Sequence, residues 1–384
     1  MLLANKQVAI VGGGPGGLTL ARLLQLKGVN VKVYERDTDK DARLVGSPLD
    51  MHEGSGMAAL IKAGLLDEFK KNFRPGADKK IIVNEQAVIQ FSDHDTKPVE
   101  DFGNAAFHPE IDKGPLRNIL LDSLQPGTVL WNRHFISLEA AGEGWQLRFK
   151  NADPAYADIV IAADGANSRI RPYLTDARPF YTGITMLEGN VHNAEKSVPT
   201  IYTLLNGGKL MAFGNEKNLL MGLKANGDLT FYATFKPAAN WAASSGLEYS
   251  DNKQMLAWFR ETYTGWSSAW YQLFEKASTP FIPRPITCMP LDQSWIPLPN
   301  LTMIGDAAHV MPPFAGEGAN MAMLDALELS EYLTTGKYSA IHEAITAFEN
   351  SMLKRAAVAA RQSLDNGERM HSANALEQML KIFS

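Results

Sequence analysis

The chain has 384 residues, of which 45% are hydrophobic and 21% are charged, and its formal net charge is −5. This composition is ordinary for a soluble globular protein and allows roughly two to three folding units with a large core. The charge excludes a broad basic surface for nucleic acid, and no apolar run reaches the ~20 residues of a membrane span.

The cysteine content and the start of the chain indicate the compartment. Cys288 is the single cysteine, so no intrachain disulfide can form, and no motif marks it as a catalytic thiol. A strand pattern begins at Gln7 and leaves no room for a signal peptide. We therefore expect a cytoplasmic protein.

The first elements predict a βαβ unit. Gln7–Val11 is a short apolar run typical of a buried strand, Leu18–Leu26 has helical spacing, and Val29–Tyr34 indicates a second strand. The two strands of such a unit are parallel and joined by a right-handed crossover.

A glycine turn lies between the first strand and the helix. Gly12, Gly14 and Gly17 have the spacing G-x-G-x-x-G, which lets the backbone approach a phosphate closely. The helix that follows, with Pro15 at its start, offers N–H donors and partial positive charge to a pyrophosphate. Glu35 ends the second strand, where a carboxylate can accept both ribose hydroxyls of an adenosine. Together these residues predict dinucleotide binding.

Three charged residues after the second strand are further candidates for the cofactor site. Arg36 follows Glu35 directly and is almost as easily explained as a solvated charge. Arg43 precedes the loop Gly46–His52, which is rich in turn formers, and we favour a place beside the cofactor for it. Asp50 lies within the same loop.

The middle of the chain alternates between apolar and polar residues. Lys209–Phe213, Leu219–Leu223 and Leu229–Phe235 alternate with a period of two and are separated by glycine turns, which predicts an antiparallel sheet between about Tyr181 and Pro280. Lys80–Phe91 is expected to supply a second piece of that sheet.

Two later strands deliver polar loops. Ile159–Ala163 leads into Asp164–Arg171, which is either a plain strand-to-helix turn capped by Ser168 or a loop that touches dinucleotides. Leu301–Ile304 leads into Gly305 and Asp306, and the carboxylate of Asp306 can bind polyol hydroxyls such as the ribityl chain of FAD.

A helix is predicted to begin at the glycine-rich segment that follows. Gly316, Gly318 and Asn320 start it, and its N-terminus would direct positive charge at the pyrimidine edge of a flavin. Pro312 and Pro313 stiffen the approach. We expect His309 to be a packed, hydrogen-bonded residue, and the histidine spacings predict no metal site.

These elements predict an α/β fold with a discontinuous, Rossmann-like FAD-binding domain. We assign residues 1–75, 95–180 and 281–338 to that domain, and residues 76–94 and 181–280 to an antiparallel-sheet substrate-binding domain. Helical spacing from Ala340 onward predicts a long C-terminal bridging helix within residues 339–384.

Taken together, these motifs resemble the group A FAD-dependent aromatic hydroxylases. The glycine fingerprint with Glu35, the Asp164–Arg171 string and the Gly305-Asp306 string occur in that family's order across essentially the whole chain. Within the family the chain is most similar to the tetracycline-inactivating flavin monooxygenases, on the strings Tyr34–Asp37, Leu49–His52 and Met303–Gly316.

The resemblance also implies contacts for the cofactor and the substrate. Lys113 stands where that subgroup has an arginine that grips FAD, and Arg117 follows one turn later. Pro313, Gly316, Gly318 and Asn320 are implied to contact the flavin. The implied substrate-binding residues are Glu188, Lys209, Met211, Met221, Thr230, Pro313, Phe314, Gly316 and Met370.

Some of these positions depart from the subgroup. Glu188, Lys209 and Thr230 replace a glutamine, an arginine and a histidine, which puts tetracycline as the substrate in question. Lys209 is a candidate for holding a phenolate or enolate oxygen. Glu317 replaces the usual glutamine, and because a buried charge is costly we expect it to face water or to be paired.

The activity implied by the resemblance is that of an NAD(P)H- and O2-dependent monooxygenase with non-covalent FAD. NADPH or NADH would reduce the flavin transiently, oxygen would form a flavin C4a-hydroperoxide, and an aromatic or polyketide-like substrate would be hydroxylated. Tetracycline, and hence antibiotic resistance, is one possibility. No side chain is implied as catalytic, and we expect a monomer whose partner is a small aromatic or polycyclic molecule.

Two other classes of function stay open. One is a flavin reductase or halogenase of the same fold, the latter suggested faintly by Trp295-Ile296-Pro297. The other is a non-enzymatic protein that binds an aromatic ligand. Substrate-stimulated NADPH oxidation separates a binder from an enzyme, and a product gaining one oxygen separates a hydroxylase from the others.

Overall fold

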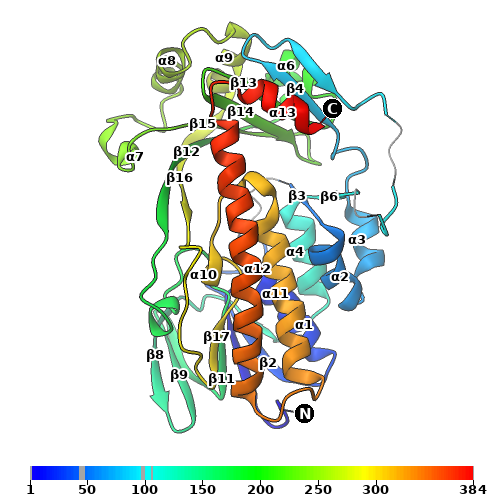
Figure 1. The fold of residues 1–384 in the computed structure, drawn as a ribbon, viewed down its shortest axis with the longest axis vertical. Helices are drawn as coiled ribbons and strands as arrows, with labels where there is room; N and C mark the ends of the chain where they lie inside the picture. Colours follow the sequence, from blue (N-terminus) through cyan, green and yellow to red (C-terminus); the bar gives the residue numbers. More distant parts are fainter. Residues whose placement is uncertain (1, 43–47, 97–99, 105–106, 384) are drawn as a thin grey trace.

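A computed structural model describes residues 2–42, 48–96, 100–104 and 107–383. The molecule is elongated, with a parallel sheet near one end, a larger mixed sheet at the other, and a long helix beside both (Figure 1). No described helix is both long and apolar enough to span a bilayer.

The parallel sheet confirms the predicted βαβ start. Its strands lie in the order β17-β11-β1-β2-β7, and every neighbouring pair is parallel. The apolar run of β11 is buried on both faces, as expected for a central parallel strand. The strands are β1 (Gln7–Val11), β2 (Asn30–Tyr34), β7 (Val129–Leu130), β11 (Ile159–Ala162) and β17 (Leu301–Met303).

Helices cover this sheet and extend beyond it. Helix α1 (Pro15–Gln25) packs against α11 (Glu317–Thr334) so closely that a Cβ on Gly16 would lie 2.8 Å from the carbonyl oxygen of Ala322. The remaining helices of this part are η1 (Glu53–Met57), α2 (Ala58–Lys62), α3 (Leu66–Asn72), α4 (Lys113–Asp122), η2 (Arg171–Tyr173), α10 (Asp306–His309) and η4 (Pro313–Ala315).

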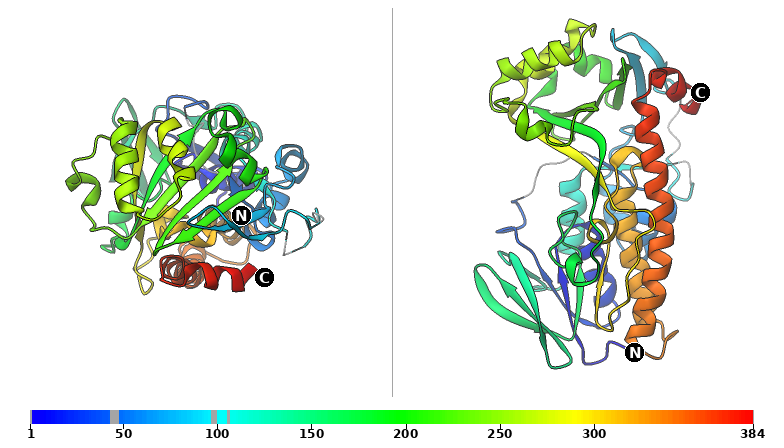
Figure 2. Two further views of the ribbon diagram at one scale, coloured as in Figure 1. Left: turned by 90° about the horizontal axis from the view of Figure 1, so that it is seen from above. Right: turned by 60° about the vertical axis from the view of Figure 1, so that its left-hand side comes forward.

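The predicted C-terminal helix is present but is divided in two. Helix α12 (Ile341–Met370) runs along most of the long axis of the molecule, and α13 (Ala375–Phe383) turns across the larger sheet (Figures 1 and 2). At the end of α12, the ring Nε2 of His371 lies 2.9 Å from the Thr234 hydroxyl and 3.1 Å from the Asn218 amide of that sheet. The long helix therefore bridges the two sheets.

The larger sheet has seven strands in the order β16-β12-β15-β14-β13-β4-β5. The three alternating segments form its central hairpins, but β4 joins β13 in parallel, so the sheet is not wholly antiparallel as expected. Its strands are β4 (Lys80–Asn84), β5 (Ile89–Ser92), β12 (Phe180–Val191), β13 (Lys209–Gly214), β14 (Lys217–Leu223), β15 (Leu229–Phe235) and β16 (Ser278–Cys288).

One face of this sheet is closed by its own helices. Leu187, Leu210, Met221 and Phe231 are buried on that face in an apolar cluster with the helices. Figure 2 shows these helices on the outer side of the sheet. They are α5 (Ala194–Ser197), α6 (Pro199–Leu205), α7 (Trp241–Ser244), α8 (Asn252–Thr262), η3 (Ser268–Trp270) and α9 (Tyr271–Lys276).

Two smaller sheets were not predicted. An antiparallel sheet of order β10-β9-β8 flanks the parallel sheet, and β3 pairs with β6 between the two large sheets. Their strands are β3 (Leu49–Asp50), β6 (Glu110–Ile111), β8 (Phe135–Ala141), β9 (Gly144–Phe149) and β10 (Ala152–Ala157).

A buried carboxyl group on α12 makes the stability of this fold depend on pH. Glu349 accepts hydrogen bonds from the Trp295 indole (2.8 Å) and the Thr302 hydroxyl (2.7 Å), yet burial outweighs them and raises its pKa from 4.5 to about 7. An acid with a raised pKa in the folded state favours folding when protonated, so this contribution is lost as pH rises from about 4.5 to about 7.

We predict that Glu349→Gln gains stability relative to the wild type as the pH increases. The difference in unfolding free energy between variant and wild type should grow by about 3 kcal/mol between pH 4 and pH 8, since each unit of pKa shift corresponds to about 1.4 kcal/mol. Urea denaturation at both pH values measures it. A difference that does not change with pH would contradict the prediction.

Candidate functional site

The glycine turn is built as the spacing predicts. Gly12 has φ +112°, and a Cβ there would lie 2.2 Å from the carbonyl oxygen of Ala163, so only glycine fits. A Cβ on Gly17 would lie 2.1 Å from the carbonyl oxygen of Gly12. At Gly14, the N-cap of α1, a Cβ would meet no described atom within 4 Å. The turn is tight on its inner side and open beside the start of the helix.

Glu35 closes this turn. Its buried carboxylate accepts hydrogen bonds from the backbone N–H of Gly13 (2.6 Å) and of Asp37 (2.9 Å). Arg117 donates to the Asp37 carboxylate at 3.0 Å and lies over the Trp131 ring, whereas Arg36 is exposed. Glu35 and Arg117 are thus linked through Asp37. Arg43, which was predicted to lie beside the cofactor, is outside the described residues.

Arg171 joins the two polar loops that follow β11 and β17. Its buried guanidinium donates to the carbonyl oxygens of Ala307 (2.7 Å), Asp306 (2.8 Å) and Ala166 (2.9 Å). Ser168 accepts from the N–H groups of Ile170 and Arg171, as a turn-forming serine does. The turn interpretation of the Asp164–Arg171 string therefore holds, and the turn also sits against Asp306.

Two carboxylates in these loops keep free acceptors. The Oδ1 atom of Asp164 is buried and has no hydrogen-bond partner among the described residues. The Asp306 side chain is only partly covered, and burial raises its pKa although His309, Lys113 and Arg171 oppose that shift. Both carboxyl groups lie within electrostatic reach of Arg171. They could accept hydrogen bonds from ribose or ribityl hydroxyls, so these residues fit FAD.

The side chain of Asn320 is fully hydrogen-bonded within the protein. Its amide oxygen accepts from the N–H of His52 (3.0 Å) and of Gly56 (3.3 Å), and its amide nitrogen donates to the carbonyl oxygens of Asp50 (2.8 Å) and Gly316 (3.1 Å). All four hydrogen-bonding positions are used. The side chain therefore fixes the loop that faces the start of α11, and the contact of Asn320 with the cofactor stays a prediction.

His52 pairs with two carboxylates at the same helix end. Its ring nitrogens lie 3.5 Å from Asp50 Oδ2 and 3.2 Å from Glu317 Oε1, and its ring centroid lies 4.4 Å from that of His108, with the two rings tilted by 30°. Burial lowers the pKa of His52, but the two carboxylates outweigh it and raise the pKa to about 9. Glu317 is therefore paired, as expected, and His52 is a site residue that the sequence analysis missed.

Asp50, His52 and His108 also offer ligand atoms within 4.8 Å of one another, although no metal site was predicted. Both ring nitrogens of His52 already face carboxylates. The ion pairs therefore account for this arrangement.

The open face of the seven-stranded sheet carries a polar row. The buried carboxylate of Glu188 accepts from Arg284 Nε at 2.5 Å and from the Asn190 amide at 3.3 Å. The Asn190 oxygen accepts from the Thr230 hydroxyl (2.7 Å) and from Lys224 (3.1 Å). Glu188 and Thr230 thus lie together, whereas Arg284 and Asn190 had no signal in the sequence, because only strand pairing brings them there.

Two lysines lie at this face, Lys113 at the start of α4 on the FAD-binding side and Lys209 on strand β13 of the sheet itself. Burial lowers the pKa of Lys113, while Glu188 on the sheet and Asp306 below it raise it, so Lys113 lies between the two units. Lys209 forms an ion pair with buried Glu110, whose pKa burial raises to about 7. Lys209 is therefore not the unpaired cation that the phenolate hypothesis requires.

An apolar wall completes the face. Phe314 packs against two clusters, one of Ile184, Met186, Leu220, Tyr232 and Ile286, and one of Met211, Phe213 and Met370. Met211, Phe314 and Met370 are thus brought together, with Pro313 beside them in η4. Met221 is wrong as a substrate contact, because it points into the helix-covered core on the other face.

Gly222 leaves a space between the polar row and the apolar wall. It pairs with Lys209 and Thr230 across the strands, and a Cβ on it would meet no described atom within 4 Å. Leu220, two residues before Gly222 on the same face of β14, packs in the cluster that includes Phe314.

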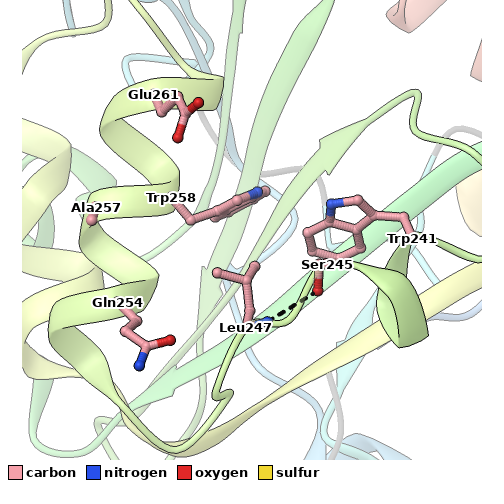
Figure 3. Close-up of a pocket in the computed structure, with 7 residues that line it drawn as sticks. All are labelled: Trp241, Ser245, Leu247, Gln254, Ala257, Trp258 and Glu261. Carbon is pink, nitrogen blue, oxygen red and sulfur yellow. Dashed lines mark hydrogen bonds between the residues drawn. The ribbon is translucent and has the colours of Figure 1, made fainter.

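A pocket of about 340 Å3 lies elsewhere, on the helix-covered side (Figure 3). It is formed around Trp241 and Trp258, whose surroundings belong to the outer apolar core. Because the sheet separates it from the glycine turn and from Asp306, it is not part of the cofactor site.

Comparison with known proteins identifies the family. The family described as FAD binding domain matches residues 5–218 and 299–363, which is more than half of the chain. The monooxygenase penA of Penicillium thymicola is 27% identical, over 97% of each chain. The 6-hydroxynicotinate 3-monooxygenase of Bordetella bronchiseptica is 25% identical, over 94% of this chain and 91% of its own.

Solved structures show the same fold. The tetracycline destructase Tet(55) superimposes with a TM-score of 0.76 at 18% identity, covering all of this chain and 96% of its own. This chain and that structure therefore share one overall fold.

We predict that Gly14→Ala weakens FAD binding without unfolding the protein. The methyl group would enter the open side of the turn, where backbone N–H groups approach a phosphate, and we expect at least a tenfold loss of affinity, about 1.4 kcal/mol. Fluorescence titration of the apoprotein with FAD measures this.

Gly103→Ala, in an exposed loop, is the matched control and should bind FAD as the wild type does. Unchanged FAD affinity in Gly14→Ala would show that the open side of the turn is not the cofactor site.

Proposed function

This chain belongs to the FAD-binding-domain family of FAD-dependent monooxygenases, and from that premise we propose that it uses NAD(P)H and O2 to hydroxylate an aromatic or polyketide-like substrate. The observation that carries the proposal is the space over Gly222. Thr230 of the polar row lies beside Gly222 on β15, and Leu220 on the same strand as Gly222 packs in the cluster that includes Phe314.

The apolar wall suits a flat ring. Phe314, Met186, Leu220 and Tyr232 would exclude water from one side of the substrate. Bound FAD would supply the redox chemistry, which no side chain of the site can provide. Exclusion of water matters because it suppresses side reactions of reactive intermediates in a closed site.

The polar row suits an oxygen-bearing substituent. Arg284 donates a hydrogen bond from Nε to Glu188, and its side chain is half exposed. Among the described residues, its two terminal guanidinium nitrogens have no hydrogen-bond partner. Lys113 stands between Glu188 and Asp306. These cations would orient a carbonyl, enolate or phenolate oxygen at the polar end of the space, while the ring lies against the apolar wall.

The relatives support this class of reaction. By its name, one of them acts on 6-hydroxynicotinate, and the fold neighbour Tet(55) is a tetracycline destructase. Tetracyclines are included in the test because of that neighbour. We also propose that residues 1–75, 95–180 and 281–338 bind FAD, while residues 76–94 and 181–280 bind the substrate.

The direct test is NADPH consumption by the FAD-loaded protein in the presence of phenolic, pyridine and polyketide compounds, tetracyclines included. A substrate should stimulate oxidation, and its product should gain one oxygen atom by mass spectrometry. A compound that binds without stimulating NADPH or NADH oxidation would instead indicate a non-enzymatic binder.

We predict that Gly222→Val impairs substrate use without affecting FAD binding. The isopropyl group would fill the space between Lys209 and Thr230, and a β-branched residue suits a strand, so the fold should be kept. We expect KM for the stimulating compound to rise at least tenfold, about 1.4 kcal/mol of lost binding.

Gly103→Val is the control for an exposed glycine away from the site. An unchanged KM in Gly222→Val would show that the substrate does not occupy this space.

A further inference from the structure

Asp50, His52 and Glu317 form a row of charges at the first turn of α11. The imidazole of His52 lies between the carboxylates, 3.5 Å from Asp50 Oδ2 and 3.2 Å from Glu317 Oε1. The side chains of Asp50, His52 and Glu317 are only 27%, 17% and 20% exposed, so water screens their charges weakly.

The row places two negative charges where a helix offers positive charge. Glu317 is the first residue of α11, after Gly316 in the left-handed conformation, and a Cβ on Gly316 would lie 3.0 Å from the Asp50 carboxylate. A carboxylate at this position offsets the partial positive charge of the helix N-terminus. The negative charges of Asp50 and Glu317 would act on any group bound there unless a cation compensates them.

His52 is the cation in direct contact with both. The Oε2 atom of Glu317 is buried without a hydrogen-bond partner among the described residues. Compensation of the negative charge of Glu317 therefore depends on His52. Lys209 also attracts Asp50, but its ammonium is bound to Glu110. The His108 ring lies beside the His52 ring, 4.4 Å between centroids.

We propose that His52 is a positioning residue that holds Glu317 in an ion pair, so that this carboxylate does not oppose the reduction of FAD bound at the N-terminus of α11. The inference rests on the proposed function, in that the flavin ring is taken to lie at this helix end. Reduced flavin carries more negative charge than oxidised flavin, so an unbalanced carboxylate disfavours it.

Substitutions of His52 and of Glu317 should shift the midpoint potential of bound FAD in opposite directions. His52→Gln removes the positive charge and should lower the midpoint potential of bound FAD. Glu317→Gln removes the negative charge and should raise it. In the double variant the local formal charge equals that of the wild type, so its potential should return close to the wild-type value.

The experiment measures the midpoint potential of bound FAD spectroscopically in the wild type, the two single variants and the double variant. We expect each single change to alter the reduced-to-oxidised ratio at fixed potential about tenfold, which is about 30 mV for a two-electron couple. The double variant should stay within about threefold of the wild type, about 15 mV on the same scale. FAD affinity is measured in parallel.

His192→Gln is the matched control, because His192 forms an imidazole–carboxylate pair with Asp228 at 2.9 Å but is 73% exposed and outside this row. It should leave the potential unchanged. If His52→Gln does not fold, Glu317→Gln alone must still raise the potential.

Shifts in one direction for both single variants, or a double variant that is not restored, would overturn the inference. So would a stoichiometric metal ion that the wild type holds and His52→Gln loses. Such results alongside substrate-stimulated NADPH oxidation would leave the proposed function intact, whereas a protein that takes up no FAD would overturn both.

Discussion

The buried carboxylate of Asp325 is the interaction on which the cofactor site depends. From α11 it accepts hydrogen bonds from the Gly305 N–H (2.9 Å) and His309 Nε2 (2.6 Å), and it pairs with Arg355 of α12 at 2.7 Å. A buried carboxylate is costly unless charges and donors replace water. Burial alone would raise the pKa of Asp325, but His309 and Arg355 hold it below its usual value. The end of β17, α11 and α12 are therefore fixed to one another.

Other contacts attach further segments to this arrangement. Arg171 attaches the loop after β11 to the backbone at Asp306, and Gly16 lets α1 approach α11. Asn320 then fixes the loop at His52 and Gly56 against the start of α11. Segments far apart in the sequence are thus held together by close packing and by buried hydrogen bonds around the start of α11.

The substrate face depends on a simpler constraint, the period of two along a strand. Met211 and Met221 are both apolar residues of the seven-stranded sheet, yet one meets Phe314 and the other lies under the outer helices. Alternation in the sequence shows that each strand has two faces, but both faces here are largely apolar. The sequence therefore could not tell which methionine faces the site, and Arg284 was missed because its partner Glu188 is on another strand.

The sequence by itself determined the parallel sheet, the glycine turn, the long C-terminal helix and the FAD-binding family, because these depend on local spacing and on residues that no other type can replace. Gly12 is such a residue, since its φ of +112° and its contact with Ala163 admit no side chain. Only the tertiary structure decided that Lys209 is paired with Glu110, that Asn320 fixes a loop, and that His52 stands between two carboxylates. Each of these depends on a partner brought near by folding, and the free energy of a buried charge is set by that partner rather than by its neighbours in the chain.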